Sequence, residues 1–217
     1  MFVEDRMTHP VITVHPETKM QDALNLMHTE HIRRLPVVDK RGKLVGIISE
    51  RDLLHASPSD VTSLSIWELN YLLSRVTVDR IMTEEVITID EGTPIEDAAL
   101  IMADSKVGGL PVVRAGHVVG IITETDLFKV FLELFGARNA GIRLTALVAN
   151  IPGELTKLTK AIFELDSIIV ALGTFLGEST ENREITMKVE SGDIKALKEA
   201  IEPVVERVID IREMKAV

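Results

Sequence analysis

Two stretches of the chain carry nearly the same succession of apolar and polar positions. Residues 7–54 and 82–128 align at an offset of 75 as far as Val38 and Val113, and at 74 beyond them. Each copy ends in Gly-Ile-Ile-(Ser/Thr)-Glu-x-Asp, where a buried strand runs into a turn that bears a hydroxyl and a carboxylate and opens a helix. A repeat of this length predicts a tandem structural unit.

Each copy has a pattern that predicts strand, helix, strand, strand, helix. β-branched runs predict buried strands, and apolar residues three or four positions apart predict helices. In the first copy we expect strands at 11–14, 35–38 and 44–49, a helix over 20–31, and a short helix around Asp52. In the second copy we expect strands at 86–89, 110–113 and 118–123, a helix over 95–102, and a helix from Asp126 onward.

The segment between the copies has helical periodicity. Ile66, Leu69 and Leu73 recur on one face, with Trp67 and Tyr71 on an adjacent face. Two interpretations stay open for this helix. Its aromatic side chains supply buried area that clamps the two repeats, or they form a surface for a partner.

The segment after the second copy is apolar almost all round. A helix of this kind, here over residues 127–135, must be covered by something, and a subunit interface is the simplest cover. The glycine-containing stretch 136–141 then breaks the pattern. We therefore expect a domain boundary at this stretch.

Residues 143–217 have the order strand, helix, strand, strand, helix, strand. The predicted strands are 143–149, 168–176, 184–190 and 208–212. The first helix is expected to begin with Asn150 as its cap and the second with Asp193. This order is that of the ferredoxin-like arrangement, in which an antiparallel sheet carries two helices on one face.

Periodicity also predicts which side chains of this last part are buried. The third strand alternates, so Thr186 and Lys188 are expected on a face open to water. The expected buried face of the first helix consists of Leu155, Leu158, Ile162 and Leu165.

Composition narrows the class of protein. The 217 residues include no cysteine, which excludes disulfides and thiolate metal sites. No apolar run is long enough to cross a bilayer and no apolar leader follows Met1, so we expect a cytoplasmic protein. The net charge of −10 argues against the broad basic face that nucleic-acid binding requires. No nucleophile–base set stands out, so we expect a protein that is not an enzyme.

The two copies resemble a tandem pair of CBS domains. Residues 143–217 resemble an ACT domain, through the strand–Asn-Ile-Pro-Gly-Glu-Leu–helix run and the element order. The resemblance implies a mixed α+β fold, in which two β-α-β-β-α repeats form one module before a ferredoxin-like βαββαβ domain. The implied divisions are 1–58, 59–78 as a linker helix, 79–136 and 142–217. This order of domains is similar to that of AcuB-like acetoin-utilisation proteins.

CBS pairs commonly bind adenosine-containing ligands such as AMP, ADP, ATP or S-adenosylmethionine, with one site per repeat. The resemblance implies that Asp52 and Asp126 accept the ribose hydroxyls, while Ser49 and Thr123 bond ribose or phosphate oxygens. The residues that would sandwich the adenine are Val11, Thr13, Val86 and Thr88. Alternatively, each aspartate only caps the short helix that it opens.

The copies differ in the charges available for phosphate. In CBS pairs the helix-to-strand turn of one repeat tends to face the ligand site of the other. The resemblance then implies that Arg33 and Arg34 serve the Asp126 site and that Lys106 serves the Asp52 site. We therefore expect unequal sites, with the Asp126 site favouring a phosphorylated ligand. Alternatively, the two arginines are solvated or pair with surface carboxylates.

ACT domains bind small ligands, often amino acids, near the turn after the first strand. Here that turn holds Asn150, where an aspartate is common, and Gly153, where a ligand can approach the backbone. A dimerising role is implied for this domain. The whole resemblance implies a non-catalytic sensor of an adenosyl ligand, with a control role in acetoin or acetate-type metabolism. The alternative is a ligand-free dimeric scaffold for a partner enzyme.

Overall fold

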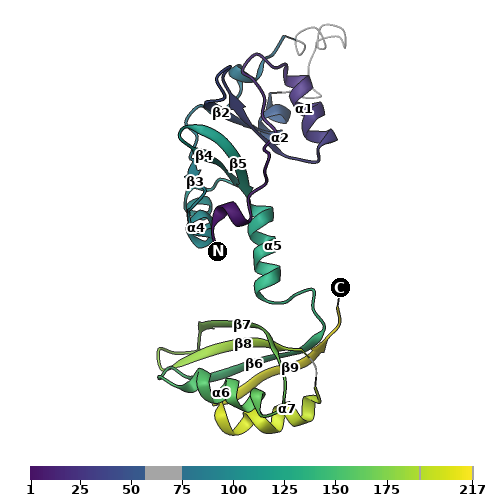
Figure 1. Cartoon of the computed structure of the whole chain (residues 1–217), viewed down its shortest axis with the longest axis vertical. Coiled ribbons are helices and arrows are strands. Elements are labelled where there is room, and N and C mark those ends of the chain that lie inside the picture. Colours follow the sequence, from purple (N-terminus) through teal and green to yellow (C-terminus); the bar gives the residue numbers. More distant parts are fainter. Residues whose placement is uncertain (57–74, 191, 217) are drawn as a thin grey trace. The chain divides into compact units, whose positions relative to one another are not determined.

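The computed structural model describes residues 1–56, 75–190 and 192–216 (Figure 1). The expected linker helix with Ile66, Trp67 and Tyr71 lies outside these residues. The chain folds into two compact units, the first over Met1–Leu127 and the second over Phe128–Val217. In the described part of the chain, no helix is both long enough and apolar enough to cross a membrane.

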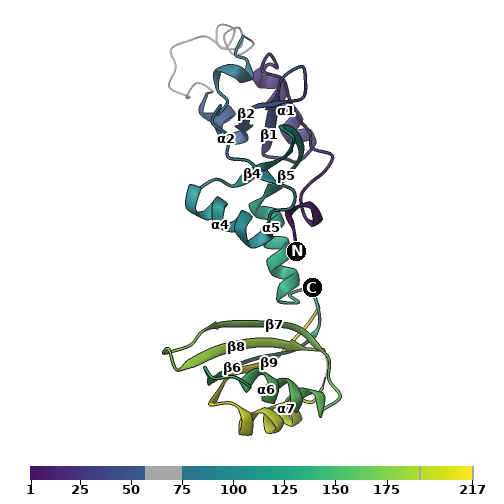
Figure 2. The same ribbon diagram turned by 60° about the vertical axis from the view of Figure 1, so that its left-hand side comes forward.

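The first repeat follows the predicted order from its first helix onward (Figure 2). Its elements are η1 (Val3–Asp5), α1 (Met20–Thr29), β1 (Arg34–Val38), β2 (Leu44–Ser49) and α2 (Glu50–His55). Met20, Ala23 and Met27 recur at helical spacing on α1 and are fully buried, which fixes the helix against the β1–β2 hairpin. Gly42 closes the hairpin at a φ of +77°, a conformation that suits glycine.

The second repeat has the corresponding elements and, in addition, the short strand β3; its last helix is longer than that of the first repeat. They are η2 (Val78–Arg80), β3 (Ile89–Asp90), α4 (Ile95–Ser105), β4 (Gly109–Arg114), β5 (His117–Thr123) and α5 (Glu124–Leu134). Strand β4 lies between β3 and β5, parallel to the first and antiparallel to the second. Helix α4 buries Ala98 and Met102 against these strands.

The first predicted strand of each repeat is much shorter than expected. Over residues 11–14 only Val14 pairs, through a parallel bridge to Val37, and over 86–89 only Ile89 belongs to β3. In the first repeat, Pro10 and Pro16 bracket the segment, and proline lacks the N–H that a ladder needs. The prediction of a full strand here is wrong, although the equivalent pairing position is kept in both repeats.

The start of each repeat packs on the other repeat. Val3 lies in the core of the second repeat and Val78 in the core of the first. Thr8 pairs with Ile121 of β5, and Thr83 pairs with Ile47 of β2 in the same antiparallel manner. The two repeats are therefore joined by a reciprocal exchange of their first residues.

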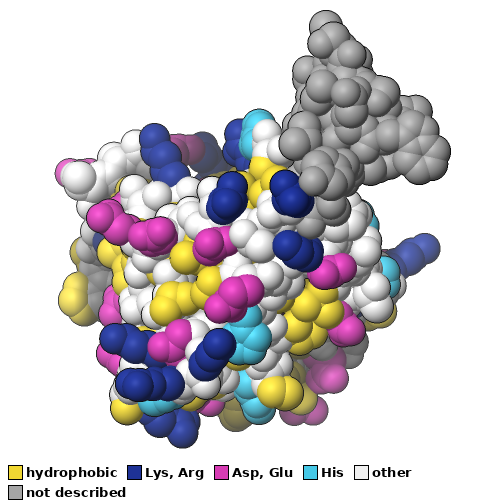
Figure 3. Space-filling view, turned by 90° about the horizontal axis from the view of Figure 1, so that it is seen from above, with side chains coloured by type: hydrophobic (Ala, Val, Ile, Leu, Met, Phe, Trp, Pro, Cys, Tyr) yellow, Lys and Arg dark blue, Asp and Glu magenta, His cyan; other side chains and the backbone are white. Residues whose placement is uncertain are grey.

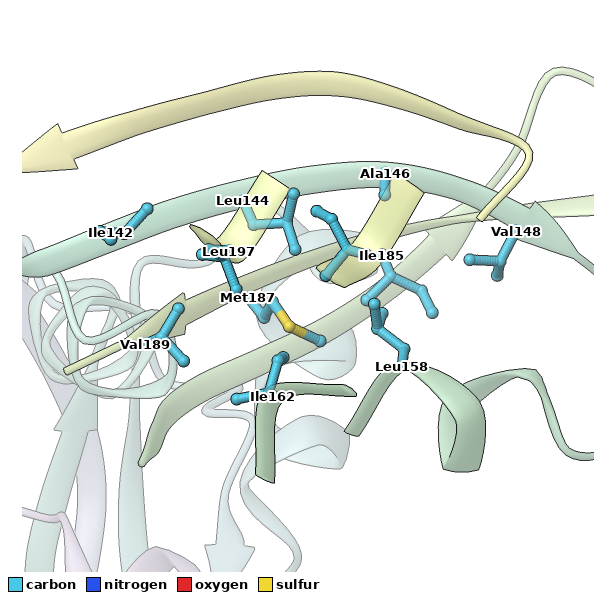
Figure 4. Packing of buried hydrophobic residues seen from close by; sticks show 11 residues of the cluster. Ile142, Leu144, Ala146, Val148, Leu158, Ile162, Ile185, Met187, Val189 and Leu197 are labelled. Atoms are coloured by element: carbon cyan, nitrogen blue, oxygen red, sulfur yellow. The ribbon is translucent and has the colours of Figure 1, made fainter. Parts of the chain in front are cut away.

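The second unit has the βαββαβ order expected from the sequence. Its elements are β6 (Gly141–Ala149), α6 (Glu154–Phe163), β7 (Ile169–Leu176), β8 (Asn182–Val189), α7 (Ile194–Ile201), η3 (Glu202–Val204) and β9 (Arg207–Met214). The antiparallel sheet has the strand order β7-β8-β6-β9. Both helices cover one face, where Leu144, Leu158 and Met187 meet in the core (Figure 4).

Three details of this unit differ from the sequence-based predictions. Helix α6 begins at Glu154 with Gly153 as its N-cap, at a φ of +96°, so Asn150 does not cap it. Leu155 is 41% exposed instead of buried. Thr186 and Lys188 are buried, because Lys188 Nζ donates to the carbonyls of Gly136 and Asn139, which precede β6. The predicted Asp193 cap is confirmed by its bond from the Lys195 N–H.

Candidate functional site

A cavity of about 420 Å³ lies between the two repeats. Its walls come from the β2–α2 junction of the first repeat and from residues 83–87 and the turn 106–109 of the second. The polar residues of its lining are Arg33, Arg34, Ser49, Glu50, Arg51, Asp52, Thr83, Glu85 and Lys106. This volume falls in the range of small-molecule sites in proteins.

Ser49 and Asp52 form a reciprocal hydrogen-bonded pair at the β2–α2 junction. The Ser49 N–H and hydroxyl donate to Asp52 Oδ2 at 2.8 and 2.6 Å, and the Asp52 N–H donates to Ser49 Oγ at 3.3 Å. This capping box fixes both side chains on the cavity wall. Among the described residues no hydrogen bond reaches Asp52 Oδ1, so that oxygen remains able to accept from a ligand.

Thr123 and Asp126 repeat this geometry at the β5–α5 junction. The Thr123 N–H and hydroxyl donate to Asp126 Oδ2 at 3.0 and 2.7 Å. Asp126 is only 7% exposed, whereas Asp52 is half-buried. Neither Thr123 nor Asp126 is among the residues that line the 420 Å³ cavity. The two junctions thus share the two hydrogen bonds to the aspartate Oδ2 and differ in their surroundings.

The cationic side chains are arranged differently from the sequence-based interpretation. Lys106 lines the cavity with Ser49 and Asp52, as that interpretation has it, but so do Arg33 and Arg34, which it assigned to the Asp126 site. The reason is that the turns 31–34 and 106–109 face one another, with Arg34 against Gly108.

Both positively and negatively charged side chains line the cavity. The cavity lining includes Arg33, Arg34, Arg51 and Lys106, against the carboxylates of Glu50, Asp52 and Glu85. On the face shown in Figure 3, basic and acidic side chains are interspersed. An anion in the cavity would therefore be held by these neighbouring side chains and not by the bulk charge of the protein.

The apolar part of the lining is only partly the one inferred from the sequence. Val86 lines the cavity, whereas Val11, Thr13 and Thr88 are not among the lining residues. The apolar side chains that the sequence reasoning missed are Ile47, Ile87 and Val107. Strand alternation offers a signal for the first of these, because Ile47 stands two residues before Ser49 on β2 and so shares its face.

Of the two candidate residues of the second unit, Asn150 has structural contacts, whereas a Cβ on Gly153 would meet no atom within 4 Å. Asn150 Nδ2 donates to the Thr180 carbonyl at 3.0 Å, and Arg183 Nε donates to Asn150 Oδ1 at 3.3 Å. The amide therefore ties the β6–α6 turn to the β7–β8 hairpin. A ligand ammonium at Oδ1 would have to compete with Arg183.

These features define a duplicated αβ module with a small-molecule cavity between its copies. The CBS domain family profile matches residues 3–59 and 78–133, which is more than half of the chain. The chain therefore belongs to the CBS domain family. A CBS domain-containing protein of Dictyostelium discoideum is 33% identical over 62% of this chain and 93% of its own length. The L-aspartate semialdehyde sulfurtransferase of Methanocaldococcus jannaschii is also 33% identical, but the match spans only 23% of that enzyme.

Three solved structures share the fold of the repeat pair. The CBS domain pair of protein MJ0100, in complex with 5′-methylthioadenosine and S-adenosyl-L-methionine, is 32% identical, with a TM-score of 0.51 over 60% of this chain and 95% of that one. CBSX2 in complex with AMP is 35% identical, with a TM-score of 0.52 over 61% and 97%. A Vibrio cholerae protein assigned to acetoin utilization (AcuB) is 32% identical, with a TM-score of 0.53 over 63% and 93%.

Proposed function

We propose that this protein is a non-catalytic regulatory protein that binds an adenosine-containing ligand in the 420 Å³ cavity between its repeats. The observation that carries the proposal is that the cavity brings together Ser49, Asp52 and Lys106, three residues proposed for the ligand from the sequence. Complexes of similar CBS pairs with S-adenosyl-L-methionine, 5′-methylthioadenosine and AMP support it.

Each part of such a ligand has a matching part of the lining. The ribose hydroxyls would donate to Asp52 Oδ1, which is held in place by the bonds from Ser49 to Oδ2. Hydrogen bonds to a carboxylate are stronger than those between neutral groups. The adenine would lie against the apolar side chains of Ile47 and Val86.

The charges of the lining favour a phosphorylated ligand in this cavity. Arg33, Arg34 and Lys106 supply guanidinium and ammonium groups, which bind phosphate oxygens well. AMP would use these groups, whereas the sulfonium of S-adenosylmethionine would add another positive charge. We therefore assign the preference for phosphate to the Asp52 cavity, in place of the Asp126 site suggested by the sequence.

For the second unit we propose an ACT domain that dimerises the protein. The βαββαβ order and the β7-β8-β6-β9 sheet support the ACT assignment. Edge strands usually carry charges that prevent pairing, as β9 does with Arg207, Asp210 and Arg212. The edge strand β7 carries no charged residue, and its Leu176 is 82% exposed. A second copy of β7 would cover it around a twofold axis.

The likeness to the Vibrio cholerae protein supports a role in the control of acetoin or acetate-type metabolism. The CBS pair would respond to an adenosyl ligand, and the second unit would provide the dimer contact and a place for another metabolite. A ligand-free scaffold for a partner enzyme is the alternative, and it predicts no adenosyl binding.

A calorimetric panel tests the proposal. Adenosine, AMP, ADP, ATP, S-adenosylmethionine and 5′-methylthioadenosine would each be titrated into the full chain, with GMP as a control for the base. We expect saturable binding of at least one adenosyl ligand, a higher melting temperature in its presence, and weaker binding of GMP. Absence of binding by all six adenosyl ligands would favour the scaffold alternative.

A further inference from the structure

We propose that the second unit binds a small aliphatic carboxylate in a cavity on the sheet face that α6 and α7 leave uncovered. This cavity has a volume of about 170 Å³. It is lined by the apolar side chains of Phe135, Ala171 and Met214 and by the polar side chains of Arg143, Thr186 and Lys188. The proposal concerns a different unit from the nucleotide cavity and does not depend on it.

Lys188 carries a buried positive charge beside this cavity. This residue is only 4% exposed, and its ammonium donates to the carbonyls of Gly136 and Asn139. An ammonium has three donors, and among the described residues no carboxylate forms an ion pair with it. A buried charge without a counter-charge is unfavourable, so an anion in the cavity would stabilise this arrangement.

Arg143 shares its carboxylate partner, Asp210, with Arg212. Its Nη1 donates to Asp210 Oδ2 at 3.2 Å, and the same carboxylate also accepts three hydrogen bonds from Arg212. One carboxylate therefore serves two guanidinium groups. Arg143 retains donors for another acceptor, because a guanidinium has five. The Thr186 hydroxyl, at 3.1 Å from that of Thr145, supplies a further polar group on the lining.

Size and wall chemistry restrict the ligand. A cavity of 170 Å³ is smaller than the pockets of about 300–1,000 Å³ that hold drug-sized ligands. It therefore suits a small ligand, such as a carboxylate with two or three further carbons. The side chains of Phe135, Ala171 and Met214 offer an apolar surface to the carbon chain. Inorganic phosphate has the charge but no apolar part, and a long fatty acid does not fit.

Titration of the full chain with sodium butyrate tests this inference. Butyramide, which has the shape without the charge, and inorganic phosphate are the competing probes, and sodium chloride keeps the ionic strength equal. We expect saturable binding of butyrate and at least tenfold weaker binding of butyramide and of phosphate. Binding of phosphate as tight as that of butyrate would overturn the proposal, and so would absence of butyrate binding.

Two variants locate the site. Arg143→Gln removes the accessible charge, and Ala171→Leu fills the cavity while all charges remain. We expect each to weaken butyrate binding about tenfold or more, with an unchanged circular dichroism spectrum and urea midpoint as the check of folding. Arg207→Gln is the matched control, because Arg207 pairs with Glu178 away from the cavity. Butyrate affinity that is unchanged in both variants, or lost equally in the control, would contradict the assignment.

Discussion

Arg34 of the first repeat lies against the backbone of Gly108 of the second repeat, in the space that a side chain at position 108 would occupy. In the aligned sequence, Gly108 and Gly109 stand where the first repeat has Arg33 and Arg34. The two turns face one another, so a pair of arginines on both sides would compete for one space. The difference between the copies is therefore what allows both arginines of the first repeat to line the Asp52 cavity.

Gly108→Ala tests this arrangement. The added methyl group would meet the guanidinium of Arg34 and the carboxylate of Glu124, and Arg34 would move because it is the end of a flexible side chain. We expect AMP to bind about three- to tenfold more weakly and adenosine to bind as before, since only AMP uses the cation. Calorimetric titration with both ligands measures this difference.

Gly92→Ala is the control for that variant. A Cβ on Gly92 would meet no other atom within 4 Å, so this substitution changes the same residue type in the same repeat without displacing anything. We expect unchanged affinity for AMP and for adenosine. An equal loss for both ligands in Gly108→Ala would show that Arg34 does not act on the phosphate.

The uncharged edge strand β7 predicts the oligomeric state. Leu176→Lys would place a charge on this edge, and two such charges would meet around a twofold axis. We expect the wild type to have twice the mass of one chain in light scattering and Leu176→Lys to have the mass of one chain. Ile209→Lys, on the other edge strand β9, is the matched control and should remain a dimer. A monomeric wild type would refute this interface.

Asp210 predicts a dependence of stability on pH. Hydrogen bonds from Arg212, together with the charges of Arg212 and Arg143, hold the pKa of Asp210 below its ordinary value of 3.8. A carboxyl group whose pKa is lowered by folding stabilises the folded state above its unfolded pKa, and this contribution is lost as the pH falls further. We expect Asp210→Asn to be less stable than the wild type at pH 7, with a difference that shrinks below pH 3.8.

Urea denaturation followed by circular dichroism measures that difference across the pH range. Glu199→Gln is a suitable control, because its carboxylate pairs only at 3.9 Å with an exposed lysine on the same helix. The prediction would be contradicted if the difference in the free energy of unfolding between wild type and Asp210→Asn stayed constant down to the most acidic pH.

Local sequence patterns suffice for the hairpins and most helices. The strand predicted over residues 44–49 is β2, and the apolar spacing that predicted the first helix identifies the buried Met20 and Met27. Such patterns report which side of an element is apolar, but they do not report which element covers it. The exchange of Val3 and Val78 between the two cores could not be read from periodicity for this reason.

The same limit of local patterns explains why the full lining of the cavity and the burial of Lys188 could not be predicted from the sequence. Alternation along β8 predicts a wet face, yet Lys188 is buried because the chain before β6 presents two carbonyls to its ammonium. The Ser49–Asp52 pair was recognisable because it is local and duplicated. The position of Arg34 could not be predicted in the same way, because it depends on how two turns far apart in the sequence face one another.

The most direct measurement compares Asp52→Asn with Asp126→Asn in a calorimetric titration of AMP. An asparagine at either position keeps an oxygen for the cap, so the two variants are matched in structure and differ in the repeat they alter. We expect Asp52→Asn to weaken AMP binding roughly 10- to 100-fold and Asp126→Asn to leave the affinity of this cavity for AMP nearly unchanged. Loss of AMP binding in Asp126→Asn, with full affinity in Asp52→Asn, would contradict this expectation.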